Sequence, residues 1–133
     1  MDVLSSRTLL YPTDFARTVR FYDEVLGLSR YREYGTGGEV SGVVWFLGGG
    51  FLEASAHGDA GAGPEDGPVR LWLQVADVDA EHHRLAHAGA AILAPPADMP
   101  WGLRESWVAD PDGLRICLVQ VPGDHPLRRR VSP

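Results

Sequence analysis

Three kinds of side chain in this sequence could take part in chemistry. Glu53 and Glu105 are carboxylates, and each could accept a proton as a general base. Cys117 is the single cysteine, and it would serve as a nucleophile if a histidine stood beside it as base. Arg7 and Arg70 could contact a ligand or form ion pairs with the two glutamates, because a buried guanidinium needs a partner. These residue types fit either a catalytic site or a binding site.

Two further patterns look like binding motifs but favour structural roles. His83 and His87 are four residues apart in a predicted helix, yet no third ligand or adjacent general base accompanies them. We therefore interpret them, together with His82, as a solvated helix face. The glycine triplet at 48–50 lacks the Lys-Ser/Thr pair and the following helix of a phosphate-binding loop, so it predicts a hairpin turn. Cys117 has no histidine on its face and is interpreted as a small buried residue.

The elements that position these residues occur twice. SRTLLYPTD and VRLWLQVAD each hold an arginine, a short apolar strand and an aspartate that can cap a following helix. The apolar spacing predicts helices over 14–26 and 77–88. The Gly/Pro-rich stretch 57–68 is a predicted linker between the halves. Strands are expected at 29–34, 40–47 and 51–56, and again at 91–94, 103–109 and 114–121.

Turn residues indicate which side chains share a face of each hairpin. The motif DPDG predicts a type I turn within a three-residue loop. Counting outward from that loop places Trp107 opposite Cys117, and cross-strand partners share a face. The same loop length at the glycine triplet places Trp45 opposite Glu53.

Alternation along the strand at 69–75 places its polar residues on the face away from the helix, and the repeat predicts the same for the first half. One sheet face then gathers aromatic, charged and amide side chains. That mixture fits a concave, partly wet pocket, although packing of the tryptophans in a core is the alternative. Trp101 is expected at the rim, in a Pro/Gly loop. The predicted ligand-binding residues are Arg7, Leu9, Tyr11, Trp45, Glu53, Arg70, Trp72, Gln74, Trp101, Glu105, Trp107 and Cys117.

The composition argues against several classes of partner and location. Hydrophobic residues make up 44% and charged residues 23% of 133 residues, as in ordinary globular domains. A net charge of −6 argues against a nucleic-acid partner, and the basic run LRRR at 127–130 is interpreted as a solvated terminus. A single cysteine is compatible with a reducing cytoplasm. No apolar run approaches the roughly 20 residues of a membrane span, and the N-terminus does not read as a signal peptide.

The stretches LLYPTDFARTVRFYDEVLGL and DPDGLRICLVQ, within this repeated layout, resemble the vicinal oxygen chelate superfamily. That superfamily includes glyoxalase I, extradiol dioxygenases, and fosfomycin-resistance and bleomycin-resistance proteins. The resemblance implies an α+β fold in which two βαβββ modules, about 5–56 and 69–121, form a cupped mixed sheet. The length of 133 residues fits a single domain over 1–133, and the basic residues near the end predict a tail over 122–133. The resemblance also implies a homodimer.

Metalloenzymes of this superfamily hold one divalent ion with His or Glu side chains, and the resemblance places their four positions at Arg7, Glu53, Arg70 and Cys117. Arginine cannot ligate a metal, and one carboxylate with one thiolate falls short of the usual three or four ligands. We therefore expect no metal and no cofactor. The stretch PWGLRESWVADPDG is similar to the bleomycin-resistance branch, whose members bind a drug without metal and release it unchanged.

The leading hypothesis is metal-independent binding and sequestration of a small hydrophobic or aromatic molecule, such as an antibiotic or another secondary metabolite. The protein would act as a cytoplasmic homodimer that contacts neither nucleic acid nor membrane. The alternative is a lyase or isomerase of the superfamily that uses Glu53 or Glu105 as its base, or a metalloenzyme whose ligands lie elsewhere. A third hypothesis is a degenerate homologue with a structural or interaction role. The fold does not choose among them, because one fold hosts many chemistries.

Overall fold

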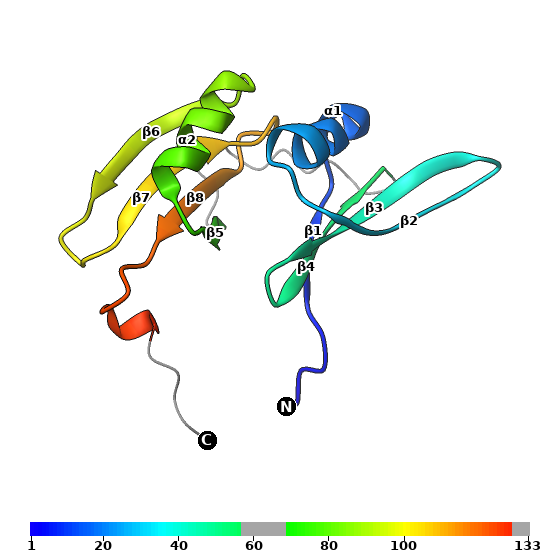
Figure 1. Cartoon of the computed structure of the whole chain (residues 1–133). Helices are drawn as coiled ribbons and strands as arrows, with labels where there is room; N and C mark the ends of the chain where they lie inside the picture. The colour runs from blue at the N-terminus through cyan, green and yellow to red at the C-terminus, as the bar shows by residue number, and fades with distance from the viewer. Residues whose placement is uncertain (57–68, 129–133) are drawn as a thin grey trace. The chain divides into compact units, whose positions relative to one another are not determined.

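The computed structural model describes residues 1–56 and 69–128. The chain divides into two compact units, with the boundary between Asp66 and Gly67, and each unit has its own sheet and helix (Figure 1). The predicted linker and the end of the predicted basic tail lie outside the described residues. No helix within the described residues is long and apolar enough to cross a membrane.

Unit 1 is a four-stranded mixed sheet with one helical segment. In the sheet β4 lies between β1, to which it is parallel, and β3, to which it is antiparallel, and β2 follows β3 at the far edge. The elements are β1 (Arg7–Leu10), α1 (Phe15–Arg20), the π-helical turn η1 (Phe21–Val25), β2 (Arg30–Thr36), β3 (Glu39–Leu47) and β4 (Gly50–Ser55).

Unit 2 repeats this topology, with the strand order β5-β8-β7-β6 and the same parallel pairing of its first and last strands. The predicted α+β fold with two βαβββ modules is therefore confirmed. The elements are β5 (Leu71–Gln74), α2 (Val78–His87), β6 (Ala91–Asp98), β7 (Arg104–Ala109), β8 (Arg115–Gln120) and the short 3-10 helix η2 (Pro126–Arg128).

The repeated aspartate begins each helix, as the sequence predicts. The carboxylate of Asp14 accepts a hydrogen bond from the backbone N–H of Arg17 at 3.1 Å. In unit 2 the carboxylate of Asp77 accepts one from the backbone N–H of Ala80 at 3.0 Å. Both bonds satisfy an N–H of the first turn that has no partner within the helix.

The first helix departs from the regular helix expected over 14–26. After α1 the chain widens into η1, where the N–H of Leu26 bonds the carbonyl of Phe21 at 2.7 Å, a spacing of five residues. Phe21 and Leu26 are buried, so the wider turn still contributes to the core of unit 1.

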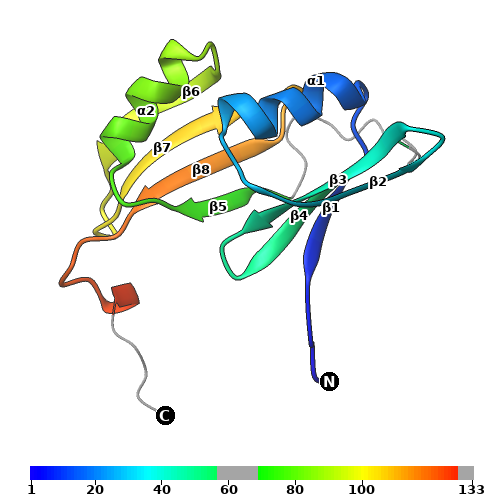
Figure 2. The ribbon, with the colours of Figure 1, turned by 45° about the vertical axis from the view of Figure 1, so that its right-hand side comes forward.

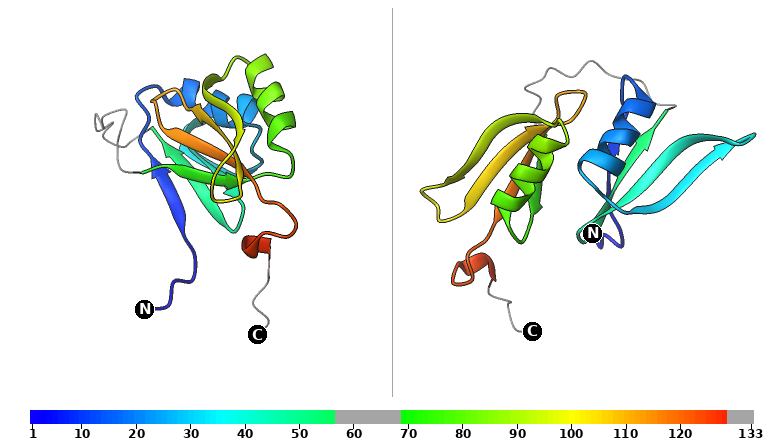
Figure 3. Two further views of the ribbon diagram at one scale, coloured as in Figure 1. Left: turned by 90° about the vertical axis from the view of Figure 1, so that its left-hand side faces the viewer. Right: turned by 45° about the horizontal axis from the view of Figure 1, so that its top comes forward.

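Each helix runs along one face of the sheet of its own unit (Figures 2 and 3). We call this face the helix-covered face and the opposite one the helix-free face. In unit 2 the helix-covered face includes Gln120, whose side-chain carbonyl accepts a hydrogen bond from the N–H of Val78 at 3.0 Å. Val78 and Leu85 of α2 are fully buried there. Part of the core of each unit therefore lies between its helix and its sheet. In unit 2 a second buried cluster lies on the helix-free face and consists of Leu103, Cys117, Val119 and Val121.

Candidate functional site

The β7–β8 hairpin has the predicted three-residue loop. The N–H of Asp110 donates to the carbonyl of Leu114 at 2.9 Å, which closes the loop. Trp107 pairs with Cys117 across the two strands, as expected, and Glu105 lies two residues further on the same face. The predicted pairing is confirmed, and it places these three side chains on the helix-free face of unit 2.

The β3–β4 hairpin contradicts the prediction. Its loop has two residues, Gly48 and Gly49, and Gly48 takes a φ of +55°, as the first position of a type II′ turn requires. Trp45 therefore pairs with Leu52 and not with Glu53. A register change of one residue moves a side chain to the opposite face of the sheet. Trp45 is therefore a residue of the helix-covered face, and the prediction that it shares a face with Glu53 was wrong.

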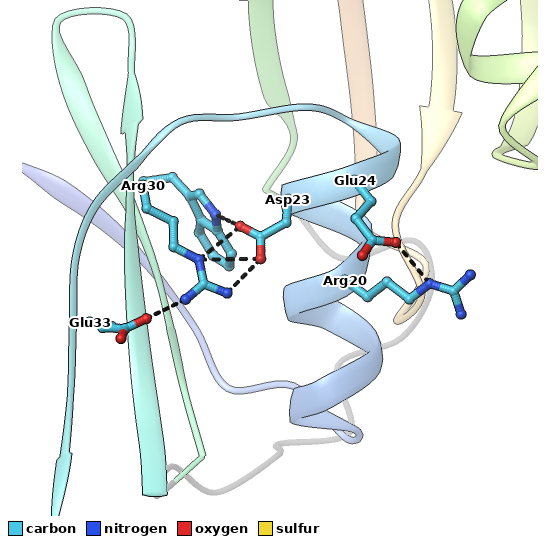
Figure 4. A network of polar contacts seen from close by, with 6 residues as sticks. Arg20, Asp23, Glu24, Arg30 and Glu33 are labelled. Atoms are coloured by element: carbon cyan, nitrogen blue, oxygen red, sulfur yellow. Dashed lines mark hydrogen bonds and ion pairs between the residues drawn. The ribbon is translucent and has the colours of Figure 1, made fainter. Parts of the chain in front are cut away.

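Trp45 is instead fully buried and anchored by a polar network (Figure 4). Its ring centroid lies 5.3 Å from that of Tyr22, and its indole N–H donates to the carboxylate of Asp23 at 2.8 Å. Arg30 donates to the same carboxylate at 2.6 Å and also pairs with Glu33. The hydrogen bond from Arg30, with help from Trp45, outweighs burial and holds the pKa of Asp23 below its usual value. The network fastens η1 to β2 and β3.

On the helix-free face of unit 1, Glu53 is the centre of a second polar group. Its Oε1 accepts from the guanidinium of Arg7 at 2.6 Å, and its Oε2 accepts from the hydroxyl of Tyr34 at 2.7 Å. Burial resists ionisation of Glu53 most strongly, but the hydrogen bonds from Tyr34 and Arg7 together outweigh it and keep its pKa below the usual value. Leu9 pairs with Glu53 in the β1–β4 register, and Leu9 and Tyr11 are each about half exposed.

Five residues of this face were missed by the sequence analysis: Tyr31, Arg32, Tyr34, Phe46 and Phe51. Phe46 pairs with Phe51, and the rings of Tyr31, Phe46 and Phe51 lie with centroids 4.8 to 5.8 Å apart. A Gly-Gly pair is itself a signal for a two-residue hairpin. That loop length would have placed Phe46 and Phe51 opposite each other on the face of Glu53.

In unit 2, β5 brings three predicted residues to the edge of the sheet. Trp72 pairs with Cys117 in the parallel β5–β8 register, so both lie on the helix-free face, and Trp72 is 51% exposed. Gln74, two residues along the strand, is exposed on the same face. Arg70 immediately precedes β5 and is also exposed. The edge of this face therefore presents an accessible indole between an amide and a guanidinium.

Further into the same face, Glu105 links the indole of Trp101 to the thiol of Cys117. Its Oε2 accepts from the indole N–H of Trp101 at 2.6 Å, and the thiol of Cys117 lies 3.4 Å from its Oε1. Glu105 is 93% shielded from solvent, whereas Trp101 is 56% exposed in the loop before β7. Trp107 is partly buried against Leu103 and the neighbouring core residues of this face. Four of the predicted residues of unit 2, namely Trp101, Glu105, Trp107 and Cys117, thus lie in one connected group.

The residues at the four positions where the family resemblance places metal ligands do not fit a divalent ion. Arg7 and Arg70 carry no lone pair to donate. Glu53 already accepts from two donors, one of them a cation. Burial, reinforced by the charge of Glu105, raises the pKa of Cys117 to about 12, so the thiolate that a metal requires is strongly disfavoured. Within the described ranges no group of three or more His, Cys, Asp or Glu residues is arranged to hold a metal ion.

Comparison with known proteins gives the same fold. Residues 5–118 match the sequence model of the Glyoxalase/Bleomycin resistance protein/Dioxygenase superfamily. A stretch of 53 residues is 46% identical to the uncharacterized protein Mb0911c of Mycobacterium bovis. That stretch covers 40% of this chain and 35% of the relative, so the match spans about a third of the relative's length.

Two solved structures are similar over most of the chain. TioX from Micromonospora sp. ML1 is 26% identical with a TM-score of 0.72, and the match covers 89% of this chain and 98% of TioX. TnmS3 from Streptomyces sp. CB03234, an antibiotic binding protein, is 25% identical with a TM-score of 0.70, and the match covers 91% of this chain and 98% of TnmS3.

Proposed function

This chain belongs to the Glyoxalase/Bleomycin resistance protein/Dioxygenase superfamily, and on that premise we propose that it binds a small hydrophobic or aromatic molecule without a metal ion and releases it unchanged. The observation that carries the proposal is that aromatic side chains lie beside charged groups on the helix-free faces of both units. In unit 1 three rings in mutual contact stand beside an ion pair, and in unit 2 a half-exposed indole stands beside a buried carboxylate. Aromatic surface with a few polar groups is typical of small-molecule sites.

Two features support binding over turnover. The pKa of Glu53 lies below its usual value because Tyr34 and Arg7 hold its charge against the cost of burial. A carboxylate stabilised in this way is a weak general base near neutral pH. The thiol of Cys117, with its pKa raised to about 12, is a poor nucleophile.

TnmS3, which is similar over nearly its whole length, supports an antibiotic or another secondary metabolite as the ligand class. A protein that binds such a molecule tightly lowers its free concentration and so protects the cell that makes or meets it. We further propose that the protein acts in the cytoplasm as a homodimer, without nucleic-acid or membrane partners. The net charge of −6 and the single cysteine support this setting.

A thermal-shift screen against a panel of natural products tests the proposal, because a ligand that binds only the folded state raises the melting temperature. We expect aromatic members of the panel to raise it. The shift should shrink in Trp72→Ala if the ligand contacts unit 2, while Val40→Ala, which trims an exposed side chain near the β2–β3 turn, serves as the control. Mass spectrometry after long incubation should recover the ligand intact. A product whose formation is lost in Glu53→Gln or Glu105→Gln would show that the protein is an enzyme.

A further inference from the structure

The helix-free face of unit 1 carries an exposed aromatic patch, which we define as Tyr31, Phe46 and Phe51. Tyr31 and Phe46 are 50% and 47% exposed, and each ring of the patch lies within 5.8 Å of the other two. The three rings come from β2, β3 and β4, so the pairing of the sheet holds them together. Such a surface can accept a flat ring system by stacking and edge contacts.

Two guanidinium groups lie on the same face as the patch, and that of Arg7 borders it directly. The guanidinium of Arg7 lies 5.9 Å from the ring centroid of Phe51, and that of Arg32 lies 5.5 Å from the centroid of Tyr34. Arg7 is already paired with Glu53. Among the residues that the structure describes, no carboxylate lies within ion-pair distance of Arg32. The positive charge of Arg32 interacts electrostatically with Glu53 without a hydrogen bond, and it helps to lower the pKa of that carboxyl.

The charge of this region opposes that of the whole chain. Arg7 and Arg32 bring two positive charges against the single carboxylate of Glu53, whereas the chain as a whole has a net charge of −6. Glu33 pairs with Val43 on β3, one register position away from Tyr34 and Gly42, so it belongs to the opposite face. Screening confines charge effects to about 8 Å at physiological salt, so a ligand on the patch responds mainly to these arginines.

We propose that the helix-free face of unit 1 selects flat aromatic molecules that carry an anionic group, and that Arg32 is the residue that recognises the anion. This inference rests on the proposed function, because it assumes that the aromatic patch holds a ligand. The rings of the patch receive the flat part of the molecule. Arg32 supplies the charge complement, since its guanidinium is held over Tyr34 and forms no ion pair among the described residues. A carboxylate, phenolate or sulfonate would each satisfy it.

Three probes with the same ring system test the inference: naphthalene-2-carboxylate, naphthalene-2-carboxamide and naphthalen-2-ylmethylammonium. Isothermal titration calorimetry measures their affinities for the full chain, and amide chemical shifts in NMR locate the contact. We expect the carboxylate to bind about fivefold more tightly than the carboxamide, which is the scale of one partly exposed ion pair, and the ammonium to bind most weakly. Added salt should shrink the preference.

Arg32→Gln should abolish the preference while leaving the affinity for the carboxamide nearly unchanged. Arg20→Gln removes the same charge from an exposed arginine on α1 that pairs with Glu24, so it should keep the preference. Phe46→Ala should weaken all three probes alike. If the probes bind equally well, the anion preference is refuted and the proposed function stands. If Arg20→Gln and Arg32→Gln act alike, or if the shifted amides lie in unit 2, the role of Arg32 is refuted. If no probe binds, the inference about the aromatic patch is refuted, and the thermal-shift screen decides the proposed function separately.

Discussion

The carboxylate of Asp23 helps to keep the side chain of Trp45 buried. The carboxylate accepts from the indole of Trp45 and from the guanidinium of Arg30. A buried indole N–H without an acceptor would be costly, so this carboxylate makes the burial of Trp45 in the core favourable. Trp45 was expected to face a ligand, and Asp23 is part of the reason that it does not.

Asp23→Asn should lower the free energy of unfolding at pH 7 by about 1 to 3 kcal/mol, because hydrogen bonds to a charged group are weakened. The pKa of Asp23 is lowered in the folded protein, chiefly by Arg30. Its contribution is therefore fully present above the usual pKa of about 4 and is lost as the pH falls through the lowered value. Urea unfolding at pH 7 and at lower pH should show the difference between variant and wild type shrinking on acidification.

Glu24→Gln is the matched control for this prediction, because the ion pair that Glu24 makes with Arg20, one turn away, is exposed. It should change stability by less than about 0.5 kcal/mol. Equal losses in the two variants, or a difference for Asp23→Asn that persists at low pH, would refute the role assigned to the network.

At the scale of the element, the two hairpins show what sequence can and cannot specify. In DPDG, the proline and the final glycine restrict the loop to one length, and Asp110 accepts hydrogen bonds from the N–H groups of Asp112 and Leu114. Three consecutive glycines allow a loop of either two or three residues, because glycine has no side chain that would favour one loop length. The two lengths differ by one residue of register, which exchanges the faces of the following strand.

The pairing of β2 with β3 depends on Gly42. A Cβ atom added at Gly42 would overlap the ring of Tyr34, which lies over this position on its way to Glu53. Gly42→Ala should therefore displace the ring and destabilise the protein by about 1 to 3 kcal/mol, the usual range for overpacking. Chemical or thermal denaturation measures the loss.

Gly49→Ala is the control in this case, because an added Cβ there meets nothing within 4 Å. It should change stability by less than about 0.5 kcal/mol. In the double variant Tyr34→Ala/Gly42→Ala the obstruction is gone, so adding Gly42→Ala to Tyr34→Ala should cost little. Additive losses would contradict the contact between Gly42 and Tyr34 as the cause.

For the whole molecule, the repeat made the fold predictable, because the same order of apolar strands, capping aspartates and helix-ending glycines occurs twice. The candidate site was less predictable. The DPDG turn allowed the residues on the helix-free face of unit 2 to be predicted. The aromatic patch of unit 1 could not be predicted in the same way, because the glycine triplet does not fix the length of the β3–β4 loop. The hydrogen bond between Tyr34 and Glu53 also lies outside any local pattern, since the two residues are nineteen positions apart.

The full chain should take up no stoichiometric metal. The four positions at which the family resemblance places metal ligands carry two arginines, a carboxylate with two donors and a thiol whose pKa is raised to about 12. Elemental analysis after incubation with zinc, nickel, manganese or iron and subsequent dialysis should find well below one ion per chain. About one ion per chain would contradict this expectation and would favour a metalloenzyme.

The burial of Trp45 affects the intrinsic tryptophan fluorescence of the protein. The sequence has four tryptophans, and Trp45 is the only one in unit 1. Its indole is fully buried on the helix-covered face, whereas Trp72 and Trp101 of unit 2 are about half exposed to water. Buried indoles emit at shorter wavelengths than hydrated ones, so Trp45 and the partly buried Trp107 contribute to the blue side of the spectrum, whereas the red side comes from Trp72 and Trp101 of unit 2. A molecule on the aromatic patch touches no indole of its own unit, while one on the helix-free face of unit 2 dims the red side directly. Loss of emission on the red side of the tryptophan spectrum is therefore a sign that a ligand lies on unit 2.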